Sequence, residues 1–359
     1  MTVDFSRKWV IIIPPDAPQA EKAAGDLYRY MGILAAPDGG LRTVRPEVGG
    51  GQKQPKVVKA SDPMPSEKVP VIVLNCGKSD SKRNGFAWRA KPERVEIFGE
   101  SSRGLCNGIY SFIAAMGISW PAPGQEKLPR AGAGLTCDNL SEPSHFDENP
   151  PLAPCRRFVP GGKRELGVML KDCEAFAAWA ARNRYDALVI PLAAFVSEKP
   201  KLKQLEKFAG EYGIALEAGG HELSSLVPRK AFLLHRDYFR MEGGKRKKDH
   251  HFCPTSPGAI RLIGEEADKL FRAADNVKVF HLWPDDGAET AWCSCPTCRA
   301  FTTPEQYRMG VNAAADILAA INPDALITYY EKPGEDGKIP LRKNTFKMEK
   351  LPETGKTES

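Results

Sequence analysis

The sequence has no long hydrophobic run. No window approaches the roughly 18 uncharged apolar residues that a membrane-spanning helix requires, so no membrane partner is expected. Residues 1–8 are polar, and the apolar run from Trp9 to Ile13 is too short for the core of a signal peptide. Because no signal peptide is visible, a cytoplasmic location is the default expectation.

Motifs for nucleotides and nucleic acids are also lacking. No Gly-x-Gly-x-x-Gly follows a predicted strand, and no phosphate-binding loop is present. The net charge is only +6, and the basic residues are scattered apart from Lys245–Lys248. Aromatic residues are not interleaved with that run, so we interpret it as a solvated loop and expect no nucleic-acid partner. Acidic sugars would also suit a mildly basic protein.

Cysteine is present but does not indicate a disulfide scaffold, because the chain has 359 residues and no export signal. Three cysteines, Cys293, Cys295 and Cys298, lie within six residues and can converge on one zinc ion. Cys253 precedes the same unit of structure and could supply the fourth ligand. Unmetallated thiols packed in a loop, or a redox cluster, are the alternatives. The redox alternative is weaker because no helix start follows the cluster.

The first part of the chain predicts a small two-layer α/β domain. Strands are expected at Trp9–Ile13, Val71–Leu74 and Arg94–Phe98, and apolar residues at helical spacing predict a helix ending at Gly32 and another beginning at Ser102. We expect this domain to span 1–125, followed by a proline-rich linker over 126–154.

Strands and helices alternate from Cys155 onward. Apolar patterns predict five strands, each separated from the next by a helix, at Arg157–Pro160, Asp186–Pro191, Ile214–Ala218, Val277–Leu282 and Ala325–Tyr330. One helix begins at Thr303-Pro304, where Gln306 is placed to complete a capping box. Such alternation fits an open doubly wound sheet or a barrel, and we favour a partial (β/α) barrel over 155–331 with a polar tail over 332–359.

Polar residues follow three of these strands, as in the active sites of barrels. They suggest catalytic carboxylates at Asp285, Asp286 and Glu331, and substrate-binding side chains at His221, Trp283, Tyr330 and Arg157. Carboxylates can protonate a leaving group or activate water, and aromatic rings can pack on sugar faces. The plainer alternatives are a turn for Asp285-Asp286-Gly287, a structural role for His221 and a solvated surface role for Glu331.

A family resemblance agrees with this interpretation. Pro14-Pro15-Asp16, Val95–Gly99, Arg103-Gly104, Gly108–Tyr110 and Met116–Trp120 resemble the accessory domain that precedes the barrel in family 20 hexosaminidases and family 67 α-glucuronidases. The remainder is similar to a bacterial barrel family, domain of unknown function 4838. Its marks are Gly220-His221, Phe252–Pro254, Asp286-Gly287 and Cys293-x-Cys295-x-x-Cys298.

The resemblance implies a glycoside-hydrolase-like protein of polysaccharide metabolism with a carbohydrate ligand. In family 20 an Asp-Glu pair ends the fourth barrel strand, with the glutamate as general acid; here Asp285-Asp286 stands there. Few strands are readable for a barrel of eight, so we expect a truncated barrel and little glycosidase turnover. The strand at Ala325–Tyr330 would then need cover from the tail, where a sixth strand could begin at Asn344–Met348, from a partner, or from a second copy through self-association. The alternative function is a non-catalytic carbohydrate-binding or zinc-stabilised interaction module.

Overall fold

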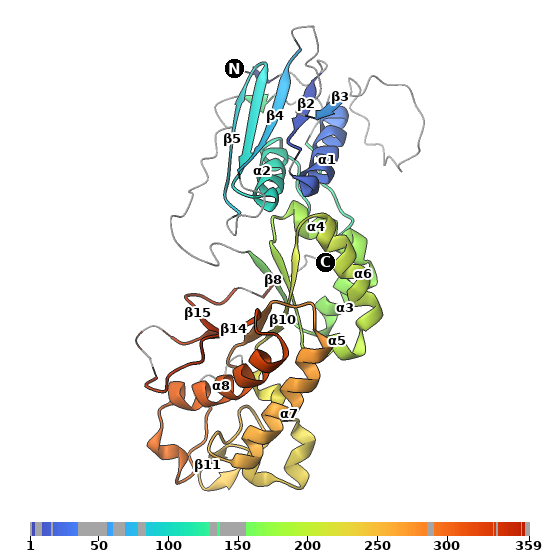
Figure 1. Cartoon of the computed structure of the whole chain (residues 1–359). Coiled ribbons are helices and arrows are strands. Elements are labelled where there is room, and N and C mark those ends of the chain that lie inside the picture. Colours follow the sequence, from blue (N-terminus) through green and yellow to red (C-terminus); the bar gives the residue numbers. More distant parts are fainter. Residues whose placement is uncertain are drawn as a thin grey trace.

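The computed structural model describes residues 2–3, 9–15, 17–34, 56–59, 69–77, 84–129, 135–136, 156–285, 291–332, 334, 337–352 and 354–355. Two separate sheets organise this part of the chain, and the chain runs from the N-terminal sheet to the second one (Figure 1). Among the described residues, no helix has the length and apolar character needed to cross a membrane.

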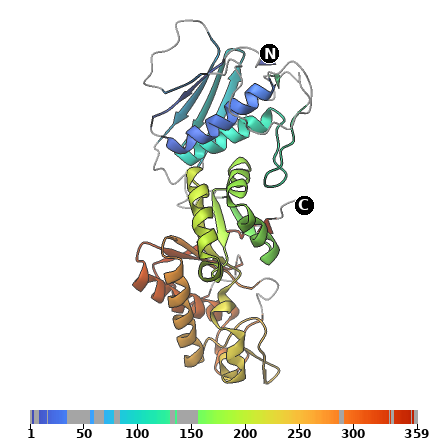
Figure 2. The same ribbon diagram turned by 90° about the vertical axis from the view of Figure 1, so that its right-hand side faces the viewer.

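The N-terminal unit is a two-layer α/β structure, as predicted. Its sheet has the order β3-β2-β4-β6-β5, and only the β5–β6 pair is antiparallel. The strands are β2 (Val10–Ile13), β3 (Lys56–Lys59), β4 (Val71–Cys76), β5 (Phe86–Lys91) and β6 (Arg94–Gly99). Helices α1 (Pro18–Leu34) and α2 (Ser102–Ala115) lie side by side on one face of it (Figure 2). A short pair, β1 (Thr2–Val3) and β7 (Leu135–Thr136), completes the unit.

The second unit is built on a parallel sheet with the order β15-β14-β13-β10-β9-β8-β16. Its strands are β8 (Arg157–Pro160), β9 (Ala187–Ile190), β10 (Ala215–Gly220), β13 (Val279–Leu282), β14 (Leu326–Tyr330), β15 (Thr345–Met348) and β16 (Thr354–Gly355). From β8 to β15 each strand pairs with the next strand of the sheet along the chain. This sequential order is that of a (β/α) barrel, because a doubly wound sheet reverses its order at a switch point.

Helices connect these strands on the outside of the sheet. They are α3 (Lys163–Lys171), α4 (Cys173–Arg182), α5 (Ala194–Ser197), α6 (Lys199–Glu211), α7 (Pro257–Ala273) and α8 (Thr303–Ile321). The loop between β10 and α7 carries 3-10 turns at Leu223–Leu226, Arg229–Leu233 and Arg236–Tyr238 and a hairpin, β11 (Met241–Glu242) with β12 (Lys245–Arg246). A further 3-10 turn, Cys298–Ala300, precedes α8.

The tail covers the strand edge that the sequence left open. The predicted sixth strand is β15, which pairs with β14 in parallel from Ile327↔Thr345 to Tyr330↔Met348. A few residues later β16 pairs with β8, the first strand of the sheet. Six residue steps span at most about 20 Å, so the two edges of the sheet lie close together and the sheet is curled. Of the three possible covers for β14 the structure supplies the tail, which removes the reason for self-association through that edge.

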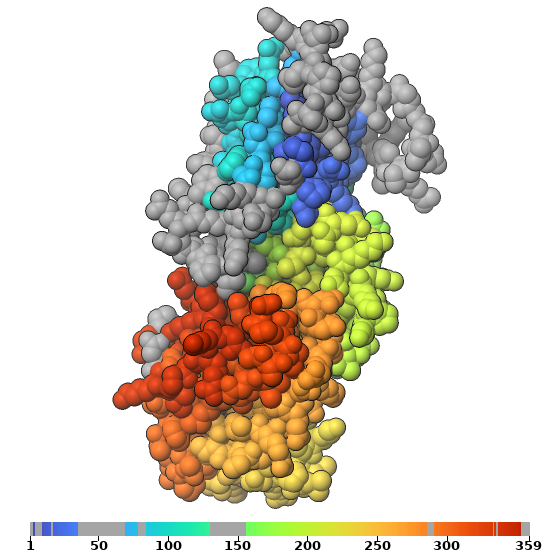
Figure 3. Space-filling model, viewed as in Figure 1, coloured from blue at the N-terminus to red at the C-terminus, as the bar shows by residue number. Residues whose placement is uncertain are grey.

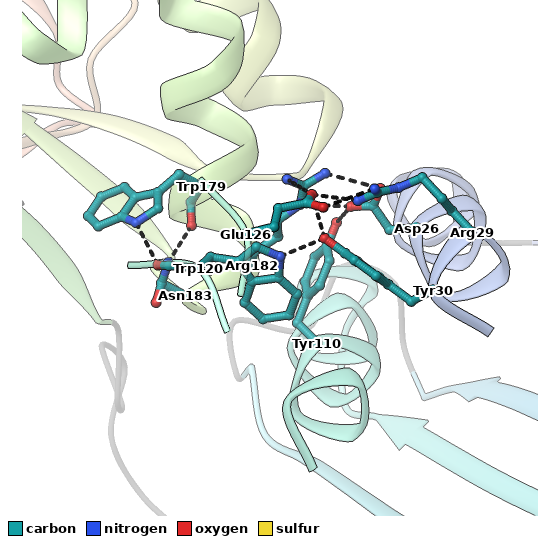
Figure 4. Close-up of polar contacts among 9 residues, drawn as sticks. All are labelled: Asp26, Arg29, Tyr30, Tyr110, Trp120, Glu126, Trp179, Arg182 and Asn183. Carbon is teal, nitrogen blue, oxygen red and sulfur yellow. Dashed lines mark hydrogen bonds and ion pairs between the residues drawn. The ribbon is translucent and has the colours of Figure 1, made fainter. Parts of the chain in front are cut away.

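The N-terminal unit packs against the amino ends of β8 to β10. Arg103 in α2 is buried and donates to Asp186, which precedes β9, and to the carbonyl groups of Tyr185 and Tyr212. On α4, Arg182 donates to Asp26 of α1 at 3.0 and 3.2 Å, and Trp179 donates to the Trp120 carbonyl at 3.0 Å (Figure 4). The carboxyl ends of the strands lie on the opposite side of the sheet, where the long loops after β10 and β13 follow them.

Candidate functional site

The ends of β10 and β13 bring three predicted site residues together. The strands are paired up to Gly220↔Leu282, and the Trp283 amide then donates to the Gly220 carbonyl at 2.9 Å. Beyond this point the His221 ring nitrogen Nδ1 lies 2.5 Å from the Pro284 carbonyl, which places the His221 side chain against the residue that precedes Asp285.

Glycine permits the close approach of these two strands. Gly219 has φ +109°, and a Cβ atom on it would lie 2.1 Å from the carbonyl oxygen of His281. Gly219 is therefore a requirement of the packing beneath the site.

Glu222 is a site residue that the sequence analysis did not identify. Its carboxylate accepts the Leu192 amide at 2.7 Å, so this side chain joins the ends of β9 and β10. Burial, with the nearby charge of Asp285 adding to it, raises the pKa of Glu222. A carboxyl group with a raised pKa beside a second carboxylate is a common arrangement in acid-base catalysis. The available signal was its place directly after His221.

Asp285, after β13, also has a buried carboxylate oxygen. Its Oδ1 atom has no hydrogen-bond partner within the described ranges, and the same holds for Nη1 of Arg229. The Asp285 charge acts on the pKa of Arg229, which burial lowers overall. Each of these two buried atoms thus lacks a partner among the described residues, which is unusual unless another polar group fills the space. Asp286 lies outside the described residues.

A buried polar network fills the sheet interior below this position. Arg157 of β8 donates to both carboxylate oxygens of Glu217 of β10, at 2.5 and 3.1 Å, and His281 Nε2 lies 2.8 Å from the same carboxylate. The other ring nitrogen of His281 lies 2.6 Å from Thr328 Oγ1, which also accepts from Trp283 Nε1 at 3.1 Å. One assignment satisfies every group: neutral His281 donates to Glu217 and accepts from Thr328.

The pKa shifts agree with this assignment. Burial raises the pKa of Glu217, but the hydrogen bonds from His281 and Arg157 and the charge of Arg157 outweigh it and lower the pKa from 4.5 to about 2. Burial lowers the pKa of His281, so this ring is neutral at pH 7. Glu217 is therefore a carboxylate held by the Arg157 cation.

Four predicted site residues are engaged in the interior of the second unit. Arg157 belongs to the Glu217 network and is 7% exposed, and Trp283 is fully buried. Tyr330 is half-buried and packs with Trp283 in the same apolar cluster. Glu331 forms a buried two-point ion pair with Arg308, at 2.6 and 2.7 Å. Arg308 also donates to the carbonyls of Gly337 and Ile339, so this pair ties the chain after β14 to α8.

The four predicted metal ligands lie together. Cys253, Cys293, Cys295 and Cys298 are all buried, and their sulfur atoms all lie within 4.8 Å of one another. Cys253 Sγ is 3.8 Å from Cys295 Sγ and 3.7 Å from Cys298 Sγ. A tetrahedral zinc with Zn–S bonds of about 2.3 Å places its sulfur ligands about 3.8 Å apart, so the donor set fits a metal ion of that kind.

The surroundings of the cluster suit thiolates. The Met241 amide donates to Cys293 Sγ at 3.3 Å, and the Cys298 amide to Cys295 Sγ at 3.4 Å. The Arg246 guanidinium lies 3.7 Å from Cys293 Sγ and brings a positive charge to the cluster.

Gln306 holds the loop from α8, and this is a correction to the sequence analysis. The capping box of α8 is formed by Thr302 and Glu305. Gln306 is buried instead, where it accepts the Cys293 amide at 3.0 Å and donates to the carbonyls of Cys293 and Cys298.

No protein-family model matches the chain, and no curated protein is similar to it, so membership of the domain of unknown function 4838 remains a prediction. Among solved structures, it is similar to the family 20 β-N-acetylhexosaminidase of Streptomyces coelicolor A3(2), with 11% identity, a TM-score of 0.50 and 96% of this chain covered. The β-N-acetylhexosaminidase of Bacteroides fragilis (13% identity, TM-score 0.48, 95% covered) and the family 20 exo-β-N-acetylglucosaminidase of Vibrio harveyi (14%, 0.48, 95%) are also similar.

The chain spans 65% of the length of the Streptomyces and Bacteroides structures and 54% of the Vibrio structure. At such low identity the likeness shows the fold alone. The observed architecture, an α/β unit followed by a sequential (β/α) barrel sheet, is thus one that glycoside hydrolases of family 20 use.

Proposed function

We propose that this chain is a glycoside-hydrolase-like protein that binds a carbohydrate at the carboxyl ends of β9, β10 and β13. The observation that carries the proposal is a buried acceptor of Asp285 and a buried donor of Arg229, both without partners among the described residues, in the loops that follow β13 and β10, where Glu222 also lies. Sugar hydroxyl groups donate and accept hydrogen bonds at once, so a bound saccharide could satisfy both atoms. His221, beside them, would border the same ligand.

The chemistry open to this pair is that of a glycosidase. Hydrolysis needs one carboxyl group that is protonated and a second that is ionised, at a defined separation. Glu222, whose pKa is raised, suits the first role, and Asp285 or Asp286 suits the second. This assignment replaces Glu331, which is neutralised by Arg308 in a buried pair.

Turnover is expected to be slow even so. Arg157, Trp283 and Glu331, three side chains expected to touch substrate, are held by contacts inside the unit. Few groups then remain to hold a sugar over the carboxylates in the geometry of a transition state. These contacts favour the second candidate, a carbohydrate-binding module without catalysis, over an efficient enzyme.

We further propose that the four cysteines bind one structural zinc ion. Zinc with four thiolates has a closed coordination shell, which suits stability and leaves no position for a catalytic water. Cys253 comes from the loop after β10, and the other three come from the loop after β13. The ion would therefore tie together the two loops that begin with Glu222 and Asp285.

A glycan array combined with a hydrolysis screen tests the carbohydrate proposal. We expect binding of a defined saccharide with little release of product, and loss of binding in Asp285→Ala. Binding that survives Asp285→Ala and Glu222→Ala alike would move the site elsewhere on the molecule. Elemental analysis of the same samples tests the zinc proposal independently.

A further inference from the structure

The positive charge of the chain is concentrated in one loop. Residues 229–249, which we call the basic lobe, contain eight lysine and arginine residues and three acidic residues, a formal net charge of +5 out of +6 for the whole chain. The lobe lies within the β10–α7 loop and forms the end of the molecule opposite the N-terminal unit (Figures 1 and 3). Its location at the carboxyl end of β10 places this charge beside the candidate site.

The carboxylates of the lobe are engaged in other contacts. Asp249 accepts from Arg240 at 2.8 and 3.0 Å, and Glu242 pairs with Arg240 and Lys247. Asp237 accepts from the Ser256 hydroxyl at 3.4 Å. Of these acids, Asp249 also acts through its charge on Arg229, one of the cations considered next.

A hollow of about 350 Å³ opens in the lobe, lined by Arg229, Lys230, Phe232, Leu233 and Lys248. Three of the five lining residues are cationic, two are apolar and none is acidic. Lys230 and Lys248 are exposed, while Leu233 is 83% exposed, an unusual position for a large apolar side chain. Such a surface offers charge to an anion and carbon atoms to the C–H face of a ring.

Arg229 joins the hollow to the carboxylate pair. It lines the hollow, its Nη2 donates to the His250 carbonyl, and its buried Nη1 has no partner within the described ranges. The charge of Asp285 also acts on the pKa of its guanidinium. We expect a ligand that lies across Arg229 to extend from the hollow toward Asp285.

We infer that the hollow is a subsite for an anionic sugar unit, one that carries a carboxylate or a sulfate group, within a longer saccharide. This rests on the proposed carbohydrate function and adds the class of substrate. The anionic group would pair with Lys230, Lys248 and Arg229, and the ring carbons would lie against Phe232 and Leu233. The neighbouring sugar would then lie at Glu222 and Asp285.

Matched ligands test this inference. Tetragalacturonate and its methyl ester share one sugar backbone and differ chiefly in charge, so we expect calorimetry to give at least about tenfold tighter binding of the charged form at low salt. The charge-reversal variant Lys230→Glu/Lys248→Glu should lose that preference. Lys199→Glu/Lys203→Glu on α6 makes the same change in net charge at exposed positions away from the lobe, and it should keep the preference.

The remaining outcomes separate this inference from the proposed function. Equal binding of both esterification states, unchanged in Lys230→Glu/Lys248→Glu, would overturn the anionic subsite and leave the carbohydrate proposal intact. Equally tight binding of dextran sulfate and of single-stranded oligothymidylate would show a site for any polyanion and would also overturn the subsite. Absence of binding to every saccharide, neutral or charged, would overturn both proposals.

Discussion

Cys253 and Cys298 bring their sulfur atoms to 3.7 Å although 45 positions separate them in the chain. The two residues belong to the loops that follow β10 and β13, and Cys293 and Cys295 complete the cluster. If four thiolates enclose a zinc ion, the purified protein should contain about one zinc per chain.

Replacing one of the four cysteines should lower the zinc content of the protein sharply. In Cys298→Ser we expect zinc, measured by inductively coupled plasma mass spectrometry, to fall well below one per chain and the melting temperature to drop, because the metal contributes folding free energy. Cys76→Ser changes a cysteine outside the cluster and should leave the zinc content unchanged. A wild-type protein purified without zinc, or a Cys298→Ser variant that melts at the same temperature as the wild type, would contradict the metal assignment.

The Arg157–Glu217 pair should give the fold an acid limit. The folded pKa of Glu217 is depressed from 4.5 to about 2, so its contribution to stability is fully present above the unfolded pKa and is lost as pH falls from about 4.5 toward 2. The shift corresponds to about 3 kcal/mol. Urea unfolding between pH 5 and pH 2.5 should show this loss in the wild type.

Glu217→Gln should lose most of that pH dependence and be less stable at pH 7, because Arg157 is then buried without its counter-ion. Glu174→Gln, at an exposed position of α4, should retain the acid transition of the wild type. If Glu217→Gln and the wild type lose the same unfolding free energy between pH 5 and pH 2.5, another group causes the loss of stability in acid.

The contact between the two units should be strong enough to couple their unfolding. Arg103→Met removes a buried cation from Asp186 and should cost about 3 kcal/mol. We expect calorimetry to show one transition in the wild type and either a lower or a split transition in the variant. Arg164→Met, at an exposed position of α3, is the matched control, and an equal effect of both substitutions would argue against a specific contact.

Much of the fold could be predicted from the sequence. The apolar runs located β9, β10, β13 and β14 to within two residues, because a strand buried on both faces leaves a nearly continuous signal. Helix α3 was missed; its N-cap, Gly162, offers no side-chain signal, and Gly167 lies in its middle. Strand β5 was missed as well, and α1 runs to Leu34, past the predicted stop at Gly32.

The candidate site was only partly predictable. Position at a strand end identified His221 and Asp285, and thiol spacing identified the four cysteines, since both signals are local. The partners of Arg157 and Glu331 depend on tertiary contacts with Glu217 and Arg308, which no local pattern records. The same holds for Glu222, whose role depends on the Leu192 amide of another strand end.

Catalytic activity should be weak. With aryl glycosides or glucuronoxylan as substrates, we expect little or no product from the 359-residue chain, because Arg157, Trp283 and Glu331 are held by internal contacts. Robust hydrolysis that Asp286→Asn abolishes would restore an efficient glycosidase and assign Asp286 a direct role.

We propose above that a carbohydrate binds at Glu222 and Asp285, in the loops after β10 and β13. The most direct test of this proposal is calorimetric titration of the best ligand from a glycan array into the wild type, Glu222→Gln, Asp285→Asn and the exposed control Glu174→Gln. We predict that both site variants bind at least about tenfold more weakly, since each loses a carboxyl group that would bind the ligand, while the control binds as the wild type does. Equal affinity in all four proteins, or no saccharide ligand at all, would contradict it.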